Sequence, residues 1–325
     1  MESLAYYIHH WSPFLIEFTP GIGIRWYGLA YVLGFLCGFL MLCRLARQGY
    51  SQLPEAKMGD FIFGLALFGV MLGGRLGYLL FYDLAGISSD PLRFFRVWEG
   101  GMASHGGILG IVIFTFWYAR RHHLFWTGLG DNLVVVAPIG IFFGRLANFV
   151  NGELYGRATT VSWAMQFPSE LLENRALADR AVMACATRVD PGLVTPEAII
   201  EATRTSEPVR AALAQILTPR HPSQLYAALL EGAFLFLALW FLRTRLRLWE
   251  GVVTGAFFIL YAAVRIFDEQ FREPDAGIAF TLGLTRGQFL SLFLIGIGAA
   301  FIATACRQRR PSPHPAKTPA GEGTV

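Results

Sequence analysis

The residues best suited to chemistry lie together near the middle of the chain, inside a segment that is otherwise apolar. Arg145, Asn148, Asn151 and Glu153 all fall within residues 144–156, which continue a long apolar run. A charge at bilayer depth costs at least about 2.5 kcal/mol, so such a side chain is rarely found there without a partner or a task. Arg145 is therefore the first residue whose presence must be explained.

Arginines recur in two further apolar segments. Arg265 follows Tyr261 by four residues and precedes Glu269 by four, so these three side chains share one face of a helix. An arginine presents a planar fork of N–H donors that matches the oxygens of a phosphate. Three arginines in separate segments are more positive charge than a helical bundle requires. The pattern favours recognition of a phosphate group within a membrane, whereas a cation transporter would need carboxylates.

The third arginine, Arg75, has two interpretations. Arg75, Tyr78 and Tyr82 are spaced i, i+3 and i+7, so they share one helix face. The tyrosines are also typical of the aromatic belt at a membrane interface, as is Tyr27. Arg75 can equally pair with an acid such as Asp83 or Glu231, because intramembrane charges usually pair. The spacing alone leaves both interpretations open.

His105 opens another apolar segment and is preceded and followed by glycines. A lone histidine in this position can simply cap or brace the helix. Gly106 and Gly110 form a small-xxx-small step that lets a neighbouring helix approach closely. Gly73, Gly74 and Gly107 are interpreted in the same way, as packing residues rather than as a ligand loop.

The sequence lacks the motifs of several common classes of enzyme. HExxH, GxSxG, Walker and CxxC motifs are all missing, and the four cysteines have no metal-binding or redox spacing. Metal-dependent hydrolysis, serine hydrolysis and a cysteine nucleophile are therefore not expected. No metal and no organic cofactor is expected either.

The elements that must position these residues are long and apolar. Hydrophobic residues make up 54% of the chain and charged residues 15%, whereas a soluble domain carries about a quarter charged residues. The apolar runs are continuous rather than alternating, which favours helices over strands. Each run approaches the ~20 residues that a helix needs to cross the hydrocarbon. The seven runs are 26–43, 60–82, 104–119, 131–150, 223–242, 251–268 and 287–306. The sequence predicts an all-α polytopic membrane protein with seven transmembrane helices.

Basic residues predict the orientation of these helices. They follow the first, third, fifth and seventh runs, and they are Arg44, Arg47, Lys57, Arg120, Arg121, Arg243, Arg245, Arg247, Arg307, Arg309 and Arg310. By the positive-inside rule, these loops and the C-terminus are cytoplasmic, and the N-terminus lies outside. The net charge of +4 reflects this loop bias, so nucleic-acid binding is not expected.

The chain is expected to contain one membrane domain over residues 1–306. Residues 157–220 are the only sizeable extramembrane insertion, and they predict a small head on the outer side, with a helix near 196–217. Residues 307–325 are rich in Pro, Ala, Gly, Thr and Lys and predict a disordered cytoplasmic tail.

Six blocks of the sequence resemble one known family. The most specific block is the run GRLANFVNGELYG at 144–156, and the others cover 25–28, 73–78, 101–107, 221–226 and 261–275. In these blocks, which occur in the expected order, the chain resembles the bacterial prolipoprotein diacylglyceryl transferases. Tyr155 departs from the tryptophan that is familiar there.

The resemblance implies an enzyme of the bacterial inner membrane that performs the first step of lipoprotein maturation. Its donor would be phosphatidylglycerol and its acceptor the lipobox cysteine of a preprolipoprotein. The thiol would take the diacylglyceryl group as a thioether, and glycerol phosphate would leave. Both substrates would enter from the bilayer, and the active site would open toward the periplasm.

The resemblance also implies roles for individual residues. Arg145 and Arg265 would stabilise the departing phosphate. His105 is the favoured base for the thiol, with Glu153 and Glu269 as rivals that can instead orient an arginine. The residues expected to bind phosphatidylglycerol are Tyr27, Arg75, Arg145, Asn148, Asn151, Gly156 and Tyr261.

Two other function classes compete with this interpretation. A lipid or anion transporter would use the same arginines as a headgroup site and would leave its substrate chemically unchanged. A membrane scaffold would use them as structural ion pairs, so that changes in them would alter stability but no turnover.

Overall fold

The computed structural model describes residues 6–19, 21–96, 100–273 and 283–315. The chain divides into two compact units. The first unit comprises Met1–Leu36, Pro138–Leu237 and Phe258–Gly296, and the second comprises Cys37–Ala137, Ala238–Phe257 and Ile297–Val325. The long helices α1 (Trp26–Arg47), α6 (Trp126–Asn151), α12 (Leu235–Arg245), α13 (Val252–Asp268) and α14 (Arg286–Gln308) contribute residues to both units.

All seven apolar runs predicted from the sequence are helical. Within the described residues, five helical segments are long and apolar enough to cross a membrane: Trp26–Arg47, Glu55–Tyr82, Trp126–Asn151, Ser223–Arg245 and Arg286–Gln308. The other two runs form α5 (Ser104–Arg121) and α13 (Val252–Asp268). These helices have 18 and 17 residues, and α5 ends in two arginines, so they fall just short on length or hydropathy. By length and composition, five of the seven predicted spans are therefore able to cross a membrane.

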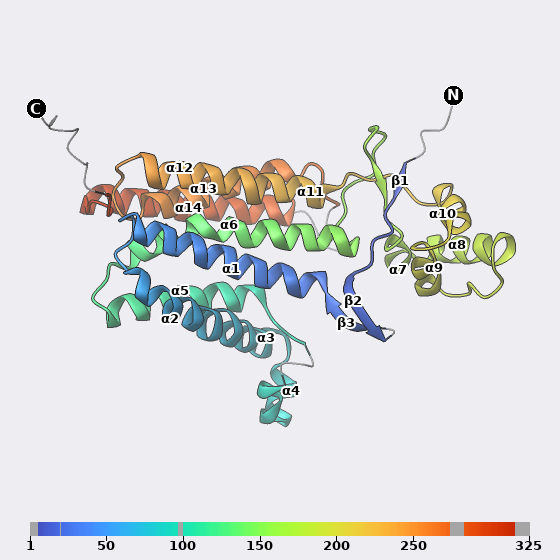
Figure 1. Cartoon of the computed structure of the whole chain (residues 1–325), viewed down its shortest axis with the longest axis horizontal. Coiled ribbons are helices and arrows are strands. Elements are labelled where there is room, and N and C mark those ends of the chain that lie inside the picture. The colour runs from blue at the N-terminus through green and yellow to red at the C-terminus, as the bar shows by residue number, and fades with distance from the viewer. Residues whose placement is uncertain (1–5, 20, 97–99, 274–282, 316–325) are drawn as a thin grey trace, which may run out of the picture. The chain divides into compact units, whose positions relative to one another are not determined.

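The insertion after α6, within the first unit, folds as a head of short helices around its own apolar core. The head contains α7 (Glu170–Glu173), α8 (Arg175–Arg188), α9 (Pro196–Ala202) and α10 (Glu207–Ala214), which lie together in Figure 1. Asn174, Thr195 and Ser206 accept hydrogen bonds from main-chain N–H groups at the starts of α8, α9 and α10. Such caps satisfy donors that the first turn of a helix leaves unpaired. The predicted helix near 196–217 is thus two helices, α9 and α10, with a break between them.

The N-terminal segment is tied to the head by a short parallel sheet. Strand β1 (Tyr7–Ile8) pairs with β4 (Met165–Gln166), and this pairing brings Ile8 into the apolar core of the head. A hairpin of β2 (Phe14–Thr19) and β3 (Ile22–Arg25) then leads into α1. The hairpin delivers Tyr27 into the first turn of that helix.

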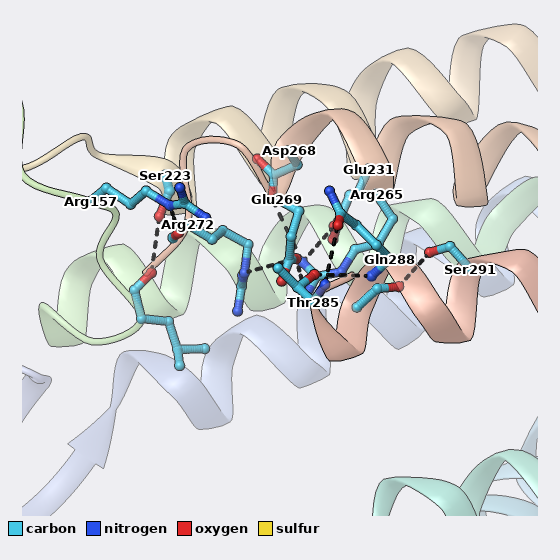
Figure 2. Close-up of polar contacts among 12 residues, drawn as sticks. Arg157, Ser223, Glu231, Arg265, Asp268, Glu269, Arg272, Thr285, Gln288 and Ser291 are labelled. Atoms are coloured by element: carbon cyan, nitrogen blue, oxygen red, sulfur yellow. Dashed lines mark hydrogen bonds and ion pairs between the residues drawn. The ribbon is translucent and has the colours of Figure 1, made fainter. Parts of the chain in front are cut away.

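Two further features of the first unit shape the surroundings of the arginines. The segment Ser223–Arg245 contains α11 (Ser223–Ala227), then a π-helical stretch, η5 (Ala228–Phe234), that carries Glu231, and then α12. Gly232 in this stretch packs against α6, because a Cβ there would lie 2.6 Å from the Cβ of Phe142. The first turn of α14 is closed by Thr285 and Gln288, each of which accepts a hydrogen bond from the other's main-chain N–H at 3.2 Å (Figure 2).

The second unit contains a close packing of α3 (Gly73–Tyr82) against α5, next to α2 (Met58–Gly64) and the π-helical η2 (Leu65–Leu72), as Figure 1 shows. Between α3 and α5, a Cβ on Gly73 would lie 2.6 Å from the carbonyl oxygen of Gly106 and 2.9 Å from the Cα of Gly110. The predicted role of these glycines in helix packing is confirmed. After α3, α4 (Leu84–Ser89) and η3 (Pro91–Phe95) follow in short succession, and η1 (Glu55–Lys57) precedes α2.

The start of the predicted tail is held in place in the second unit. Main-chain hydrogen bonds join Glu250 N to Arg310 O at 2.9 Å and Ser312 N to Leu248 O at 3.2 Å. Arg243, which is only 2% exposed, donates to the Pro313 carbonyl at 3.2 Å. Residues 316–325 of the predicted disordered tail lie outside the described residues.

Candidate functional site

The candidate site is built around Arg145, which α6 places next to Glu231 in the first unit. Nη2 and Nε of Arg145 both donate to Oε2 of Glu231, at 2.8 and 3.1 Å. The Glu231 side chain is fully buried and that of Arg145 is 18% exposed. A buried carboxylate needs such partners, because an unpaired buried charge is very costly. Glu231 therefore fixes the orientation of the Arg145 guanidinium.

Glu231 also connects Arg145 to the second predicted arginine. Nη1 of Arg265 donates to Oε1 of Glu231 at 3.4 Å (Figure 2). One carboxylate therefore bridges the guanidinium groups of Arg145 and Arg265. Arg265 further approaches two acids on its own helix, with 3.0 Å from Nη2 to Oε2 of Glu269 and 3.7 Å from Nη1 to Oδ2 of Asp268. Arg265 and Glu269, which were predicted to share one helix face, thus form an ion pair.

A third arginine completes this group of charges, which we call the arginine–carboxylate cluster. Nε of Arg272 lies 4.0 Å from Oε2 of Glu269, just past the end of α13. The cluster contains three guanidinium groups and three carboxylates: Arg145, Arg265 and Arg272 with Glu231, Asp268 and Glu269. Its charges balance when every group is ionised.

The acids leave part of each arginine fork unused. Nη1 of Arg145 and Nε of Arg265 make no hydrogen bond to any other residue that the structure describes. These N–H groups remain as donors for a further oxyanion. The two arginines are therefore oriented by acids without being saturated by them.

The asparagines of the 144–156 run surround a second carboxylate, Glu153. With its NH2 group turned toward Glu153, the Asn148 amide donates to Oε1 of Glu153 at 3.1 Å and to the Gly144 carbonyl at 3.2 Å. Asn151 donates to the same Oε1 at 3.4 Å. Gln224 in α11 donates to the Glu153 carbonyl at 2.8 Å. The end of α6 and the loop after it are therefore held by side chains from two elements.

Gly156 lies where three segments meet. Its N–H donates to the His221 carbonyl at 2.9 Å, and its own carbonyl accepts from Nη1 of Arg220 at 3.2 Å. An isolated β-bridge pairs it with Arg272. A Cβ at this position would collide with the Phe271 carbonyl oxygen, so only glycine allows the approach. Gly156 thereby sets the position of the chain that carries Arg272.

Both predicted tyrosines lie in the electrostatic environment of the arginines. The Tyr27 hydroxyl is close enough to Glu153 and Arg145 to interact with their charges, and its ring lies 5.3 Å from that of Tyr31. Tyr261 interacts in the same way with Glu231 and with Arg145. The predicted site residues of the first unit are therefore brought together.

Arg75 belongs to the second unit and is used differently from the other arginines. It is 3% exposed, and its Nε, Nη1 and Nη2 donate to five main-chain carbonyls between Arg93 and Gly101, including those of Phe94 at 3.1 Å and Arg96 at 3.0 Å. The alternative in which Arg75 pairs with Asp83 or Glu231 is wrong, because Asp83 pairs with Arg93 at 3.0 Å and Glu231 binds the arginines of the cluster. Contact between Arg75 and a lipid would require some of these bonds to break.

His105 also belongs to the second unit and lies in the first turn of α5. Its side chain is exposed and makes no hydrogen bond to the described residues, so the cap or brace considered for it is not seen. It lines an apolar groove of about 710 Å³ together with Leu76, Phe81, Leu109 and other apolar residues of α3 and α5. The imidazole is therefore accessible at the edge of an apolar surface.

The sequence identified every arginine of the cluster except Arg272, and it missed the roles of Glu231 and Asp268. Glu231 interrupts the apolar run 223–242, which is the same signal that identified Arg145. Asp268 directly precedes Glu269, and Arg272 follows it by three residues. Both are charged residues at the end of the apolar run that contains Arg265, so the sequence could have identified them.

These features define a polytopic α-helical membrane protein with a buried charged centre. The family model described as prolipoprotein diacylglyceryl transferase matches residues 13–304. The chain belongs to this family and is a transferase.

Relatives from several bacteria share most of the chain's length. A phosphatidylglycerol–prolipoprotein diacylglyceryl transferase of Bdellovibrio bacteriovorus is 39% identical over 324 residues, which covers 90% of this chain and 92% of the relative. The protein of the same name from Rhizobium meliloti is 40% identical, with 89% and 91% covered. That from Coxiella burnetii is 36% identical, with 93% and 98% covered.

Proposed function

We propose that this protein transfers the diacylglyceryl group of phosphatidylglycerol to the lipobox cysteine thiol of preprolipoproteins. The sulfur forms a bond to the glyceryl carbon as the C–O bond to the phosphate breaks, and the electron pair leaves with glycerol phosphate. The observation that carries this proposal is the pairing of Arg145 and Arg265 through Glu231 in a chain of this family. The acceptor brings its own nucleophile, which fits the missing serine and cysteine motifs.

The two arginines act on the leaving group. Negative charge grows on the departing phosphate oxygen, and the unused N–H groups of Arg145 and Arg265 are available to stabilise it. Preorganised donors of this kind contribute about 3–4 kcal/mol each to catalysis. Their effect is larger in a water-poor site, where the effective dielectric constant is low. Asn148, Tyr27 and Tyr261 supply further polar groups around the headgroup.

His105 is the base that we assign to the thiol. The two rival carboxylates already have partners, since Glu269 pairs with Arg265 at 3.0 Å and Glu153 accepts a hydrogen bond from Asn151 at 3.4 Å. His105 is accessible and has no partner among the described residues. An imidazole can take the thiol proton near neutral pH. Glu153 and Glu269 then orient the polar groups around the phosphate.

The topology follows from the distribution of basic residues. The seven helical runs would span the bacterial inner membrane, with the N-terminus and the 157–220 head on the periplasmic side and the C-terminus in the cytoplasm. Residues 1–306 would then be one catalytic domain that opens toward the periplasm. Cysteine accessibility at positions in the head and in the loop 246–250, probed in intact cells, tests this orientation.

One assay separates this function from its alternatives. Purified protein is mixed with phosphatidylglycerol and a lipobox peptide, and the peptide is followed by mass spectrometry. A diacylglyceryl adduct on the cysteine supports the transferase. Movement of unchanged lipid would instead indicate a transporter, and no turnover with a stable fold would indicate a scaffold.

A further inference from the structure

Asp268 is the least compensated acid of the arginine–carboxylate cluster. Its side chain is fully buried, and neither of its oxygens accepts a hydrogen bond from any residue that the structure describes. The contact of Nη1 of Arg265 at 3.7 Å is an ion pair without a hydrogen bond. Glu231, by contrast, accepts hydrogen bonds at 2.8, 3.1 and 3.4 Å. The carboxylate of Asp268 is therefore the one in the cluster that is protonated most easily.

The charges around Asp268 come from each element packed against it. They are Arg145 on α6, Glu231 on η5, Arg265 and Glu269 on α13, and Arg272 just beyond α13. With Asp268 ionised, three negative charges balance three positive ones. The empty site is therefore neutral in its fully ionised form.

A bound phospholipid headgroup upsets this balance. The phosphodiester brings one negative charge, so the cluster with its ligand would carry a net charge of −1 in a water-poor setting. An uncompensated charge is costly where the dielectric constant is low. One proton on an acid of the cluster restores neutrality. When it is protonated, Asp268 gives up no hydrogen bond and only an ion pair of 3.7 Å to Arg265, whereas Glu269 would give up an ion pair of 3.0 Å to the same arginine.

We propose that Asp268 takes up one proton from solvent when the phosphodiester of the donor lipid binds at Arg145 and Arg265. This inference rests on the proposed function, because it assumes that the cluster receives a phosphodiester. Asp268 takes part in lipid binding only, and the thiol proton is removed by His105. The affinity for anionic lipid then depends on pH through this residue.

The proposal is tested by lipid binding to the full chain in the absence of peptide. Phosphatidylglycerol in mixed micelles is titrated between pH 6 and pH 9 into wild type and into Asp268→Asn. Above the pH at which Asp268 ionises in the empty site, the wild-type Kd should weaken by up to about tenfold per pH unit, as one linked proton requires. Asp268→Asn, which mimics the protonated acid, should bind tightly at every pH and should exceed the wild type at high pH.

A matched control removes an acid that is paired with an arginine outside the cluster. Glu207 lies in α10 and pairs with Arg210 at the surface of the head. Glu207→Gln should keep the wild-type dependence of Kd on pH. If Asp268→Asn binds more weakly than wild type at high pH, or keeps the wild-type slope, the proposal is overturned.

Calorimetry of the wild type gives a result that does not depend on any variant folding. Binding heats measured at high pH in two buffers of different ionisation enthalpy count the protons taken up, and one proton per lipid is expected. A count of zero contradicts the role of Asp268. If the adduct still forms in the peptide assay, the proposed function stands without this inference. If the lipid neither binds nor reacts, the proposed function itself fails.

Discussion

Removal of the bridging charge at Glu231 tests how the two arginines are held. Glu231→Gln keeps the size of the side chain but cannot satisfy the guanidinium groups of Arg145 and Arg265 together. The wild-type carboxylate accepts hydrogen bonds from Arg145 at 2.8 and 3.1 Å and from Arg265 at 3.4 Å. Without it, both guanidinium groups would lose the orientation that the proposed function requires for stabilising the departing phosphate.

The size of the effect follows from the number of donors that lose their position. One misplaced donor to a developing negative charge costs about 2.7–4 kcal/mol, which corresponds to a decrease of about 10²–10³-fold in kcat. Because the variant lacks one negative charge, the net charge of the cluster becomes more positive. The KM for phosphatidylglycerol, an anionic lipid, should therefore stay the same or fall. A decrease in kcat without a rise in KM is the signature of lost transition-state stabilisation.

The assay is the initial rate of thioether formation on a lipobox peptide, with lipid concentration varied. Glu273→Gln is the matched control, because Glu273 is an exposed acid that pairs with Arg220 at 3.1 Å and not with the cluster. Thermal unfolding of both variants in detergent separates lost positioning from lost structure. A Glu231→Gln enzyme with wild-type kcat and normal stability would refute the reasoning.

Four further variants extend these tests. Arg145→Lys should lose at least about 100-fold in kcat while remaining folded, since a point charge cannot replace the fork; near-normal turnover would remove Arg145 from the phosphate. His105→Gln should lower the rate most at low pH, where few thiols ionise unaided, and a near-full rate there would place the base elsewhere. Gly156→Ala should lower the unfolding temperature, because overpacking against main chain costs about 1–3 kcal/mol, and unchanged melting would contradict the close approach. Burial raises the pKa of Glu250 from 4.5 to about 7. The free energy of unfolding should therefore be highest below pH 4.5 and should fall as the pH rises from 4.5 to 7, because the unfolded chain loses the proton first. Thermal unfolding of Glu250→Gln across this pH range should not show that fall.

The sequence predicted the helices well because long apolar runs leave the chain few alternatives. A run of about 20 apolar residues in lipid must satisfy its own main-chain hydrogen bonds, and a helix does so within one segment. All seven runs are helical for this reason. The run at 104–119 forms a shorter helix of 18 residues, α5, because Arg120 and Arg121 end its apolar part.

The partners of the charged residues were not predictable in the same way. Spacing places Arg265 and Glu269 on one face, but it does not say which acid of another helix meets Arg145. The π-helical stretch at Ala228–Phe234 adds to the difficulty, because a π-turn changes the direction in which the following side chains point. The sequence therefore left Glu231 as one of two partners for Arg75, whereas its contacts are with Arg145 and Arg265.

Arg75 shows a further limit of sequence reasoning. In the sequence, an arginine that binds a ligand cannot be distinguished from one that binds main-chain carbonyls of a loop. Here five carbonyl oxygens between Arg93 and Gly101 receive its N–H groups, and no spacing rule anticipates a partner made of main chain. Glu231 and Arg75 thus had the same signal in the sequence and have different surroundings in the fold.

The short segment after α14 has a consequence for anyone who shortens this protein. Composition suggests that everything beyond residue 307 can be deleted without loss. Deletion there would remove the Pro313 carbonyl. The buried guanidinium group of Arg243 would then lose one of its hydrogen-bond acceptors. A buried donor left without its acceptor costs about 1–3 kcal/mol. Trimmed versions that end after residue 315 should therefore purify and crystallise better than those that stop at residue 308.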